Sequence, residues 1–317
     1  MKRDKSLDIA KGIAIILMMY GHLRYHYANM DTIYSWIYSF HMPLFIYISG
    51  LLTNVKKEKN YLQLWQKIKR ILVPYAIWNV VGYYINHVLQ LDKRNVPQFI
   101  HGLLIGDNLN SNLPTWYLLS FCWITLFAFF ILPLLDTVKK LIAADIVAIL
   151  LVMCLPMVLN TQDFFRLKGF VALLPFFITG YLLKKINFQL PWWLIPLLLY
   201  VGFKLGRVNA VQSWRYITVG IGDVCVPYLY LLSAICTTLA LVEICKYLSR
   251  VPVFEVFGVF GKHTLVILCT HWLLGNILAT YMEYGVELFT IVFIIEVVIV
   301  GGIELYAMIQ AKRSRNA

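Results

Sequence analysis

Apolar segments of about twenty residues recur along almost the whole chain, and they restrict its fold more than any other feature. A helix of that length crosses the hydrocarbon core of a bilayer, where helices and closed barrels are the only viable spanning structures. Of the 317 residues, 60% are hydrophobic and 14% are charged, with a mean hydropathy of +0.72. Soluble domains carry about 25% charged residues. The sequence therefore predicts an all-α fold, a polytopic helical bundle in a lipid bilayer.

Ten segments are long and apolar enough to be expected as transmembrane helices. They are 7–24, 36–53, 71–91, 114–135, 142–159, 169–184, 191–207, 222–245, 264–281 and 287–310. The loops between them are too short for a soluble domain. Residues 1–317 are therefore expected to form a single integral-membrane domain, without a soluble extracytoplasmic domain.

The basic residues predict the orientation of the bundle. With the N-terminus inside, 19 of the 28 Lys and Arg residues fall on the inner side and seven on the outer side. This asymmetry follows the positive-inside rule, so both termini are expected in the cytoplasm. The net charge of +12 does not indicate nucleic-acid binding, because the cations lie in short runs between apolar segments.

The stretch "KGIAIILMMYGH" places two ionisable side chains in the first apolar segment. Lys11 and His22 are eleven residues apart, so a helix returns them to one face, separated by about 16 Å along its axis. Asp8 lies on the same face, where it can pair with Lys11. Ionisable groups at membrane depth are functional candidates. The alternative is that Lys11 reaches to the inner surface and His22 only caps the outer end.

Three further groups of residues suggest chemistry. His41 is expected at the same outer depth as His22, but no metal-ligand spacing accompanies it, so no metal is predicted. Lys67 and Arg70 on the inner side suit the phosphates of an anionic cofactor, or simply anchor the helix. In the outer loop, Asn110, Trp116 and Tyr117 offer amide and aromatic contacts to a sugar, or form a turn and an interfacial aromatic belt.

His271 lies in the middle of the ninth apolar segment. A histidine at this depth is expected to face the interior of the bundle. It is either a second catalytic group or a structural hydrogen-bonding residue, and the sequence leaves both interpretations open.

Several motifs occur together in a family-like order: "LDIAKGIAIILMMYGH", "FHMPLFIYISGLL", "KIKRILVPY", "PTWYLL", "LLPFFITGYLLKK" and "GKHTLVILCTHWLL". Along essentially its whole length, the chain closely resembles acyltransferase family 3, integral-membrane O-acyltransferases of the fucose 4-O-acetylase-like and exopolysaccharide acetyltransferase type. Lys11 and His22 match the family's basic residue and histidine with ten residues between them. Lys67 and Arg70 match its two-arginine motif, with lysine replacing the first arginine.

The resemblance implies an O-acetyltransferase in the bacterial cell membrane that moves an acetyl group from cytoplasmic acetyl-CoA to a polysaccharide sugar. His22 is then the expected general base, with His271 as alternative or assistant, and a covalent acyl-histidine stays open. Lys11 is expected to attract phosphate or polarise the thioester carbonyl, and Lys67 and Arg70 to hold the nucleotide. His41, Asn110, Trp116 and Tyr117 are expected near the sugar.

Two rival interpretations use the same residues. A transporter or flippase for a lipid-linked sugar also needs a polar, aromatic interior but no acetyl-CoA, and it would still move substrate after a His22→Ala change. A scaffold within a polysaccharide-assembly complex would leave the intramembrane His and Lys dispensable. Polysaccharide-assembly proteins and a second copy of the chain are the protein partners left open.

Overall fold

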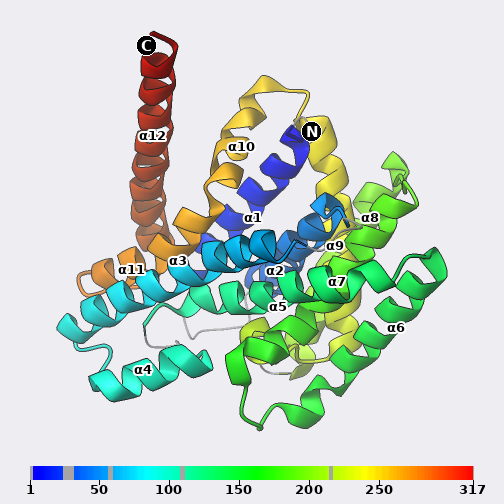
Figure 1. The fold of residues 1–317 in the computed structure, drawn as a ribbon, viewed down its shortest axis with the longest axis horizontal. Helices are drawn as coiled ribbons and strands as arrows, with labels where there is room; N and C mark the ends of the chain where they lie inside the picture. Colours follow the sequence, from blue (N-terminus) through cyan, green and yellow to red (C-terminus); the bar gives the residue numbers. More distant parts are fainter. Residues whose placement is uncertain (1–2, 24–31, 56–59, 108–110, 214–216, 317) are drawn as a thin grey trace.

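The computed structural model describes residues 3–23, 32–55, 60–107, 111–213 and 217–316. The regular secondary structure of these residues is helical, without a β-strand among them (Figure 1). The α-helices are α1 (Lys5–Leu23), α2 (Thr32–Leu52), α3 (Tyr61–Val88), α4 (Val96–Ile105), α5 (Trp116–Phe130), α6 (Val138–Cys154), α7 (Leu167–Lys185), α8 (Ile195–Ser213), α9 (Pro227–Leu248), α10 (Glu255–Lys262), α11 (Thr264–Leu278) and α12 (Val286–Asn316).

Each of the ten predicted segments overlaps one of these helices, whereas the short helices α4 and α10 were not predicted. Within the described residues, seven helices are long and apolar enough to cross a membrane. The pair Pro252–Lys262 and Thr264–Leu278, which contains α10 and α11 and is bent by 74°, makes an eighth if it is one span. The all-helical membrane fold is confirmed. The number ten and the cytoplasmic position of the termini stay predictions.

Helix α1 lies at the centre of the bundle, in contact with α2, α9, α10, α11 and α12 (Figure 1). Two glycines let α1 and α10 approach closely. A Cβ atom added at Gly12 would lie 1.8 Å from the Phe257 carbonyl oxygen, and one added at Gly261 would lie 1.8 Å from that of Asp8. Close backbone contact at small residues is a common way of packing membrane helices. It fixes the end of α1 that carries Asp8 and Lys11.

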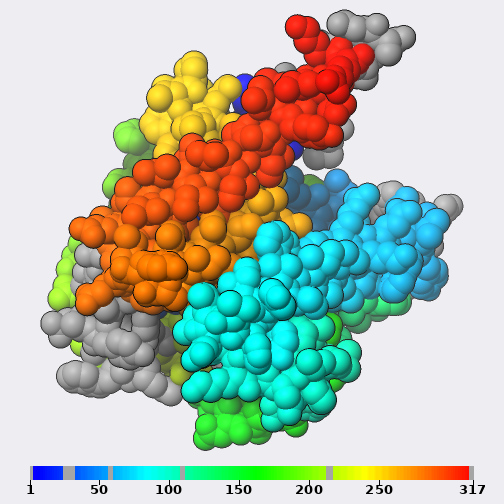
Figure 2. Space-filling model, turned by 90° about the vertical axis from the view of Figure 1, so that its left-hand side faces the viewer, coloured from blue at the N-terminus to red at the C-terminus, as the bar shows by residue number. Residues whose placement is uncertain are grey.

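Beyond Glu304, which contacts His263 and Lys262 at the bend between α10 and α11, the C-terminal part of α12 stands clear of the other helices (Figures 1 and 2). Gly301 and Gly302 have no neighbouring atom within 4 Å of an added Cβ. The N-terminal half of α12 packs on α11 and α1 instead, where Leu288, Val292 and Glu296 are fully buried. Only this half contributes to the interior of the bundle.

Candidate active site

A cavity of about 780 Å³ opens beside the Lys11 end of α1. Side chains from α1, α2, α3, α5, α7 and α11 line it. Three cations, Lys11, Lys67 and Arg70, belong to its wall. The lining also includes polar residues (Asn60, Gln63) and residues with large apolar side chains (Ile15, Met42, Phe45, Tyr117, Leu118, Phe121, Leu268). The cavity thus combines a largely apolar wall with three positively charged side chains.

The first turns of α3 supply two of these cations. Lys67 and Arg70 are three residues apart and therefore share a face of the helix. Both are exposed, and neither forms an ion pair within the described part of the chain. Lys69, between them, does not line the cavity and stacks over Trp65, with its ammonium 5.1 Å from the ring centroid. The two residues predicted as a phosphate-binding pair lie together.

Lys11 reaches the same cavity from α1. Its ammonium lies 2.7 Å from the Asp8 carboxylate, as the spacing of the two residues predicted. Arg3 also contacts this carboxylate, from outside the helix. Asp8 is buried against α10 at the glycine contact. Lys11 is therefore held in place by its pairing while its side chain remains part of the cavity wall.

Three histidines meet at the opposite end of α1. The Nδ1 atom of His22 lies 3.0 Å from Nε2 of His271, and the two rings stack with centroids 5.2 Å apart. The His41 ring is perpendicular to that of His22, with centroids 6.4 Å apart. Tyr38 and Trp272 also border His22. His22 is 9% exposed, His41 3% and His271 0%.

Two of these rings are anchored to their own helices. Nδ1 of His271 lies 2.6 Å from the Ile267 carbonyl oxygen, and Nδ1 of His41 lies 2.7 Å from that of Ile37. Both contacts join residues four apart in one helix, so neither ring is free to rotate. His271, placed in the interior by sequence reasoning, is indeed buried.

The histidine cluster and the cavity are close neighbours along the helices. Met42, which lines the cavity, directly follows His41, and Leu268 lies about one turn before His271. Ile15 precedes His22 by two turns, about 10 Å along the axis. Lining residues therefore lie within one or two helical turns of each histidine, although none of the three histidines is itself part of the cavity wall.

Three of the four residues predicted to bind a sugar lie in the described ranges. His41 belongs to the histidine cluster, and the rings of Trp116 and Tyr117 are in contact, with centroids 6.2 Å apart. Asn110 lies outside the described residues. Trp116 packs against the backbone at Gly169 and Gly220. Tyr117 lines the cavity that holds Lys67 and stacks on Phe121, with ring centroids 5.8 Å apart. Tyr117 is therefore placed to contact a molecule that binds in this cavity.

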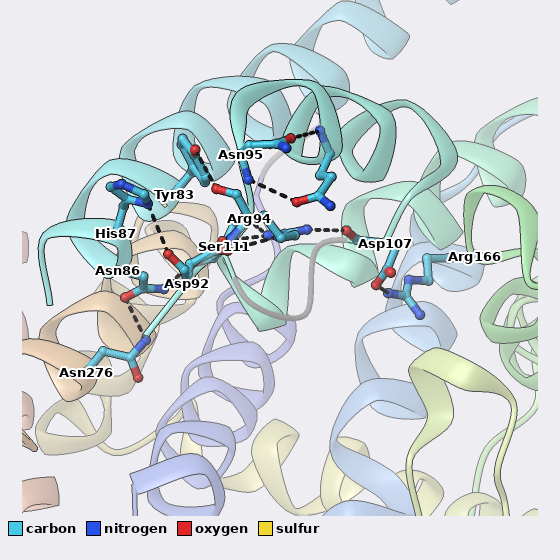
Figure 3. Close-up of polar contacts among 11 residues, drawn as sticks. Tyr83, Asn86, His87, Asp92, Arg94, Asn95, Asp107, Ser111, Arg166 and Asn276 are labelled. Atoms are coloured by element: carbon cyan, nitrogen blue, oxygen red, sulfur yellow. Dashed lines mark hydrogen bonds and ion pairs between the residues drawn. The ribbon is translucent and has the colours of Figure 1, made fainter. Parts of the chain in front are cut away.

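A polar network that sequence reasoning missed lies on the His22 side of the bundle (Figure 3). Arg94 pairs with Asp92 at 2.7 Å, and the same nitrogen donates to the Ser111 hydroxyl, also at 2.7 Å. Asn86 donates to the Ser111 carbonyl oxygen and accepts from Asn276. This network ties α3, the α4 loops and α11 together.

Asp92 and Arg94 stabilise each other's charged form. The Asp92 side chain is 0% exposed and that of Arg94 is 19% exposed. Burial alone would raise the pKa of the Asp92 carboxyl, but hydrogen bonds from the guanidinium and backbone N–H of Arg94 outweigh it and leave the pKa lowered. The hydrogen bond to Asp92 raises the pKa of Arg94 in turn.

Two neighbouring features complete the network. Arg166 is buried and donates to the Gly106 carbonyl oxygen at 2.7 Å, with Asp107 3.7 Å away (Figure 3). Asn112 donates to the Cys269 carbonyl oxygen, two residues before His271. Asn79 and Asn86 provided one usable signal, because two amides seven residues apart share a face of an apolar helix. The loop partners carry no such periodic signal.

No group of three or more His, Cys, Asp or Glu side chains in the described ranges is arranged to hold a metal ion. The geometry places a cavity with three cations in its wall within one to two helical turns of a pair of hydrogen-bonded imidazoles. Imidazole is a general base near neutral pH, so the arrangement is suited to removing a proton from a hydroxyl.

Comparisons with known proteins agree with this chemistry. A family model described as an acyltransferase domain matches residues 4–305. Over 85 residues the chain is 38% identical to nodulation protein NolL of Mesorhizobium japonicum, and 35% identical to nodulation protein NolL of Sinorhizobium fredii. Each match covers 24% of this chain and 23% of the relative. No solved structure matches the chain.

Proposed function

Because the chain belongs to the acyltransferase family whose model spans residues 4–305, we propose that it is a membrane O-acetyltransferase. Its donor is acetyl-CoA, and its acceptor is a hydroxyl group on a sugar of a cell-surface or lipid-linked polysaccharide. The observation that carries this proposal is a single one. Lys11, Lys67 and Arg70 line a cavity whose apolar lining includes Ile15 and Leu268, one to two helical turns from the paired rings of His22 and His271.

The cavity suits the two chemically different parts of acetyl-CoA. Lysine and arginine attract its phosphate groups, and the apolar lining suits its long acyl-bearing arm. In this proposal the Lys11 side of the bundle faces the cytoplasm of a bacterial cell, where the donor is found. Lys11 lies about 16 Å from His22 along α1, so its role is to hold the anionic part of the donor rather than to touch the thioester.

The reaction takes place at the histidines. His22 accepts the proton of the sugar hydroxyl as its oxygen attacks the thioester carbonyl carbon. A new C–O bond forms, the C–S bond breaks, and the proton passes from His22 to the sulfur of CoA. Burial of the three rings excludes water, which would otherwise compete with the sugar hydroxyl as the nucleophile.

The proposal is tested on the surface polysaccharide of the source cells. In a deletion strain, the NMR spectrum should lack an O-acetyl signal that the wild-type gene restores. A His22→Gln gene should not restore it. A His101→Gln gene is the matched control, because His101 is exposed on α4 and remote in sequence from His22, His41 and His271. An unchanged set of acyl signals in the deletion strain would contradict the proposed function.

A further inference from the structure

Three groups form a buried hydrogen-bonded series next to the cavity. The Ile267 carbonyl oxygen lies 2.6 Å from Nδ1 of His271. The other nitrogen of that ring, Nε2, lies 3.0 Å from Nδ1 of His22. Nε2 of His22 is the ring nitrogen left at the end of this series, and the His22 ring is bordered by the rings of Tyr38, His41 and Trp272.

The chemistry of the first group fixes the direction of every hydrogen bond that follows. A carbonyl oxygen can only accept, so Nδ1 of His271 must carry the hydrogen. In a neutral imidazole the second nitrogen is then an acceptor. Nε2 of His271 therefore accepts, and Nδ1 of His22 must donate to it. Nε2 of His22 is left with a free lone pair.

Burial keeps both rings neutral before the reaction. His271 is 0% exposed and His22 is 9% exposed. Within the described part of the chain neither ring contacts a carboxylate, so an imidazolium here would be a buried charge without a counter-ion. Such a charge is costly. The neutral tautomers derived above are therefore the resting arrangement.

We infer that His271 is a positioning residue that holds His22 as its Nδ1–H tautomer and thereby presents Nε2 as the general base. The inference rests on the proposed function and adds separate roles for the two histidines, His22 as the base and His271 as the residue that orients it. When Nε2 of His22 takes the hydroxyl proton, the Nδ1–H bond to His271 stabilises the cation that forms. That proton then leaves with the CoA sulfur, which restores the neutral pair.

His41 provides a built-in comparison. Its Nδ1 is anchored to a carbonyl four residues earlier, as in His271, and its ring is equally buried. Its ring lies perpendicular to that of His22, with the centroids 6.4 Å apart. Among the described residues, His271 alone hydrogen-bonds to His22, so substitution of His41 should not change the His22 tautomer.

The experiment uses the full chain, labelled with ¹⁵N in its histidine rings and reconstituted in lipid nanodiscs. The His22 signals are assigned from their loss in a His22→Gln protein. In the wild type, ¹⁵N spectra should show His22 with a proton on Nδ1 and none on Nε2. His271→Leu should give a mixture with the Nε2–H tautomer. His271→Gln keeps an acceptor oxygen and should retain the wild-type tautomer, as should His41→Gln.

Activity provides the second readout, measured with acetyl-CoA and the polysaccharide of the deletion strain. His271→Leu should lower kcat about 10²-fold or more, within the range for a disordered general base, with little change in KM for acetyl-CoA. His271→Gln should recover most of this loss. A purely structural role for His271 would lower the amount of folded protein without changing the His22 tautomer.

Two results would overturn the inference. One is a wild-type His22 with its proton on Nε2, and the other is a His271→Leu protein with an unchanged His22 tautomer and unchanged kcat. A wild-type protein with the expected tautomer but no acyl transfer would instead contradict the proposed function and leave the tautomer assignment in place.

Discussion

The two ends of the bundle use cations in opposite ways. At the Lys11 end, Lys67 and Arg70 are exposed at a cavity and form no ion pair within the described ranges. At the His22 end, the guanidinium of Arg94 is mostly buried, and protein oxygen atoms of Asp92, Asp107 and Ser111 accept its hydrogen bonds.

This difference indicates that the cations at the Lys11 end are available to bind a ligand, whereas Arg94 at the His22 end stabilises the fold. A cation whose hydrogen-bond donors are already used within the protein has few donors left for a ligand. Its removal leaves the partner carboxylate buried without a counter-ion. A cation at a cavity wall without a partner costs little to replace, but it can attract an anionic ligand. The comparison therefore predicts that substitutions at the two ends affect different measurements.

The largest effect is expected at Arg94. Arg94→Gln leaves the Asp92 carboxylate buried without its counter-ion, which should lower the free energy of unfolding by about 3–5 kcal/mol. Thermal unfolding of the purified protein in detergent, followed by tryptophan fluorescence, measures the change. The double variant Asp92→Asn/Arg94→Gln should recover part of the loss because it removes the buried charge.

Arg207→Gln is the matched control for this experiment. Arg207 is exposed near the end of α8, so its replacement should change stability by less than about 0.5 kcal/mol. If Arg94→Gln unfolded at the same temperature as Arg207→Gln, the network in Figure 3 would not stabilise the folded protein as predicted.

A smaller effect, on binding alone, is expected at the cavity. Lys67→Gln and Arg70→Gln should each raise KM for acetyl-CoA about tenfold, equivalent to about 1.4 kcal/mol, with kcat and stability nearly unchanged. Lys69→Gln is the matched control, because Lys69 stacks over Trp65 and does not line the cavity.

A truncated donor sharpens this test. Acetyl-pantetheine carries the same thioester but none of the phosphates, so its KM should be indifferent to Lys67→Gln and Arg70→Gln. Equal losses with both donors would mean that these cations shape the cavity rather than bind phosphate.

The smallest effect is expected from acid. The pKa of Asp92 is lowered in the folded protein from its ordinary value of about 3.9. The carboxylate therefore contributes stability that is complete above that value and is lost as the pH falls through the folded-state pKa. The stability advantage of the wild type over Asp92→Asn should stay constant from pH 7 to pH 5 and shrink below about pH 4. A constant advantage down to pH 3 would contradict this role.

The apolar segments predicted the helices well because hydrophobic length is a local property of the sequence. The short helices α4 and α10 were not predicted, because neither is long enough to cross a bilayer. α10 exists as a separate helix because the chain turns by 74° at His263, between α10 and α11. Gly261, two residues before the bend, packs against the backbone of α1, and a contact with a helix so distant in the sequence leaves no local pattern.

The candidate site was predictable where one helix carries it. The spacing of Asp8 and Lys11 led to their ion pair, and the spacing of Lys67 and Arg70 led to a shared face. The contact between His22 and His271 joins residues 249 positions apart, so the sequence could mark each histidine but not pair them. The same distance problem hid the links from Arg94 to Ser111 and from Asn86 to Asn276.

Transfer of a labelled acetyl group tests the central claim most directly. Full-length protein in proteoliposomes would receive acetyl-CoA labelled on its acetyl carbon together with the polysaccharide of the deletion strain. The wild type should transfer label to the polysaccharide, whereas His22→Gln should still bind acetyl-CoA but transfer about 10²–10⁴-fold more slowly. Transfer at the wild-type rate by His22→Gln would contradict a reaction path from the Lys11 cavity to His22.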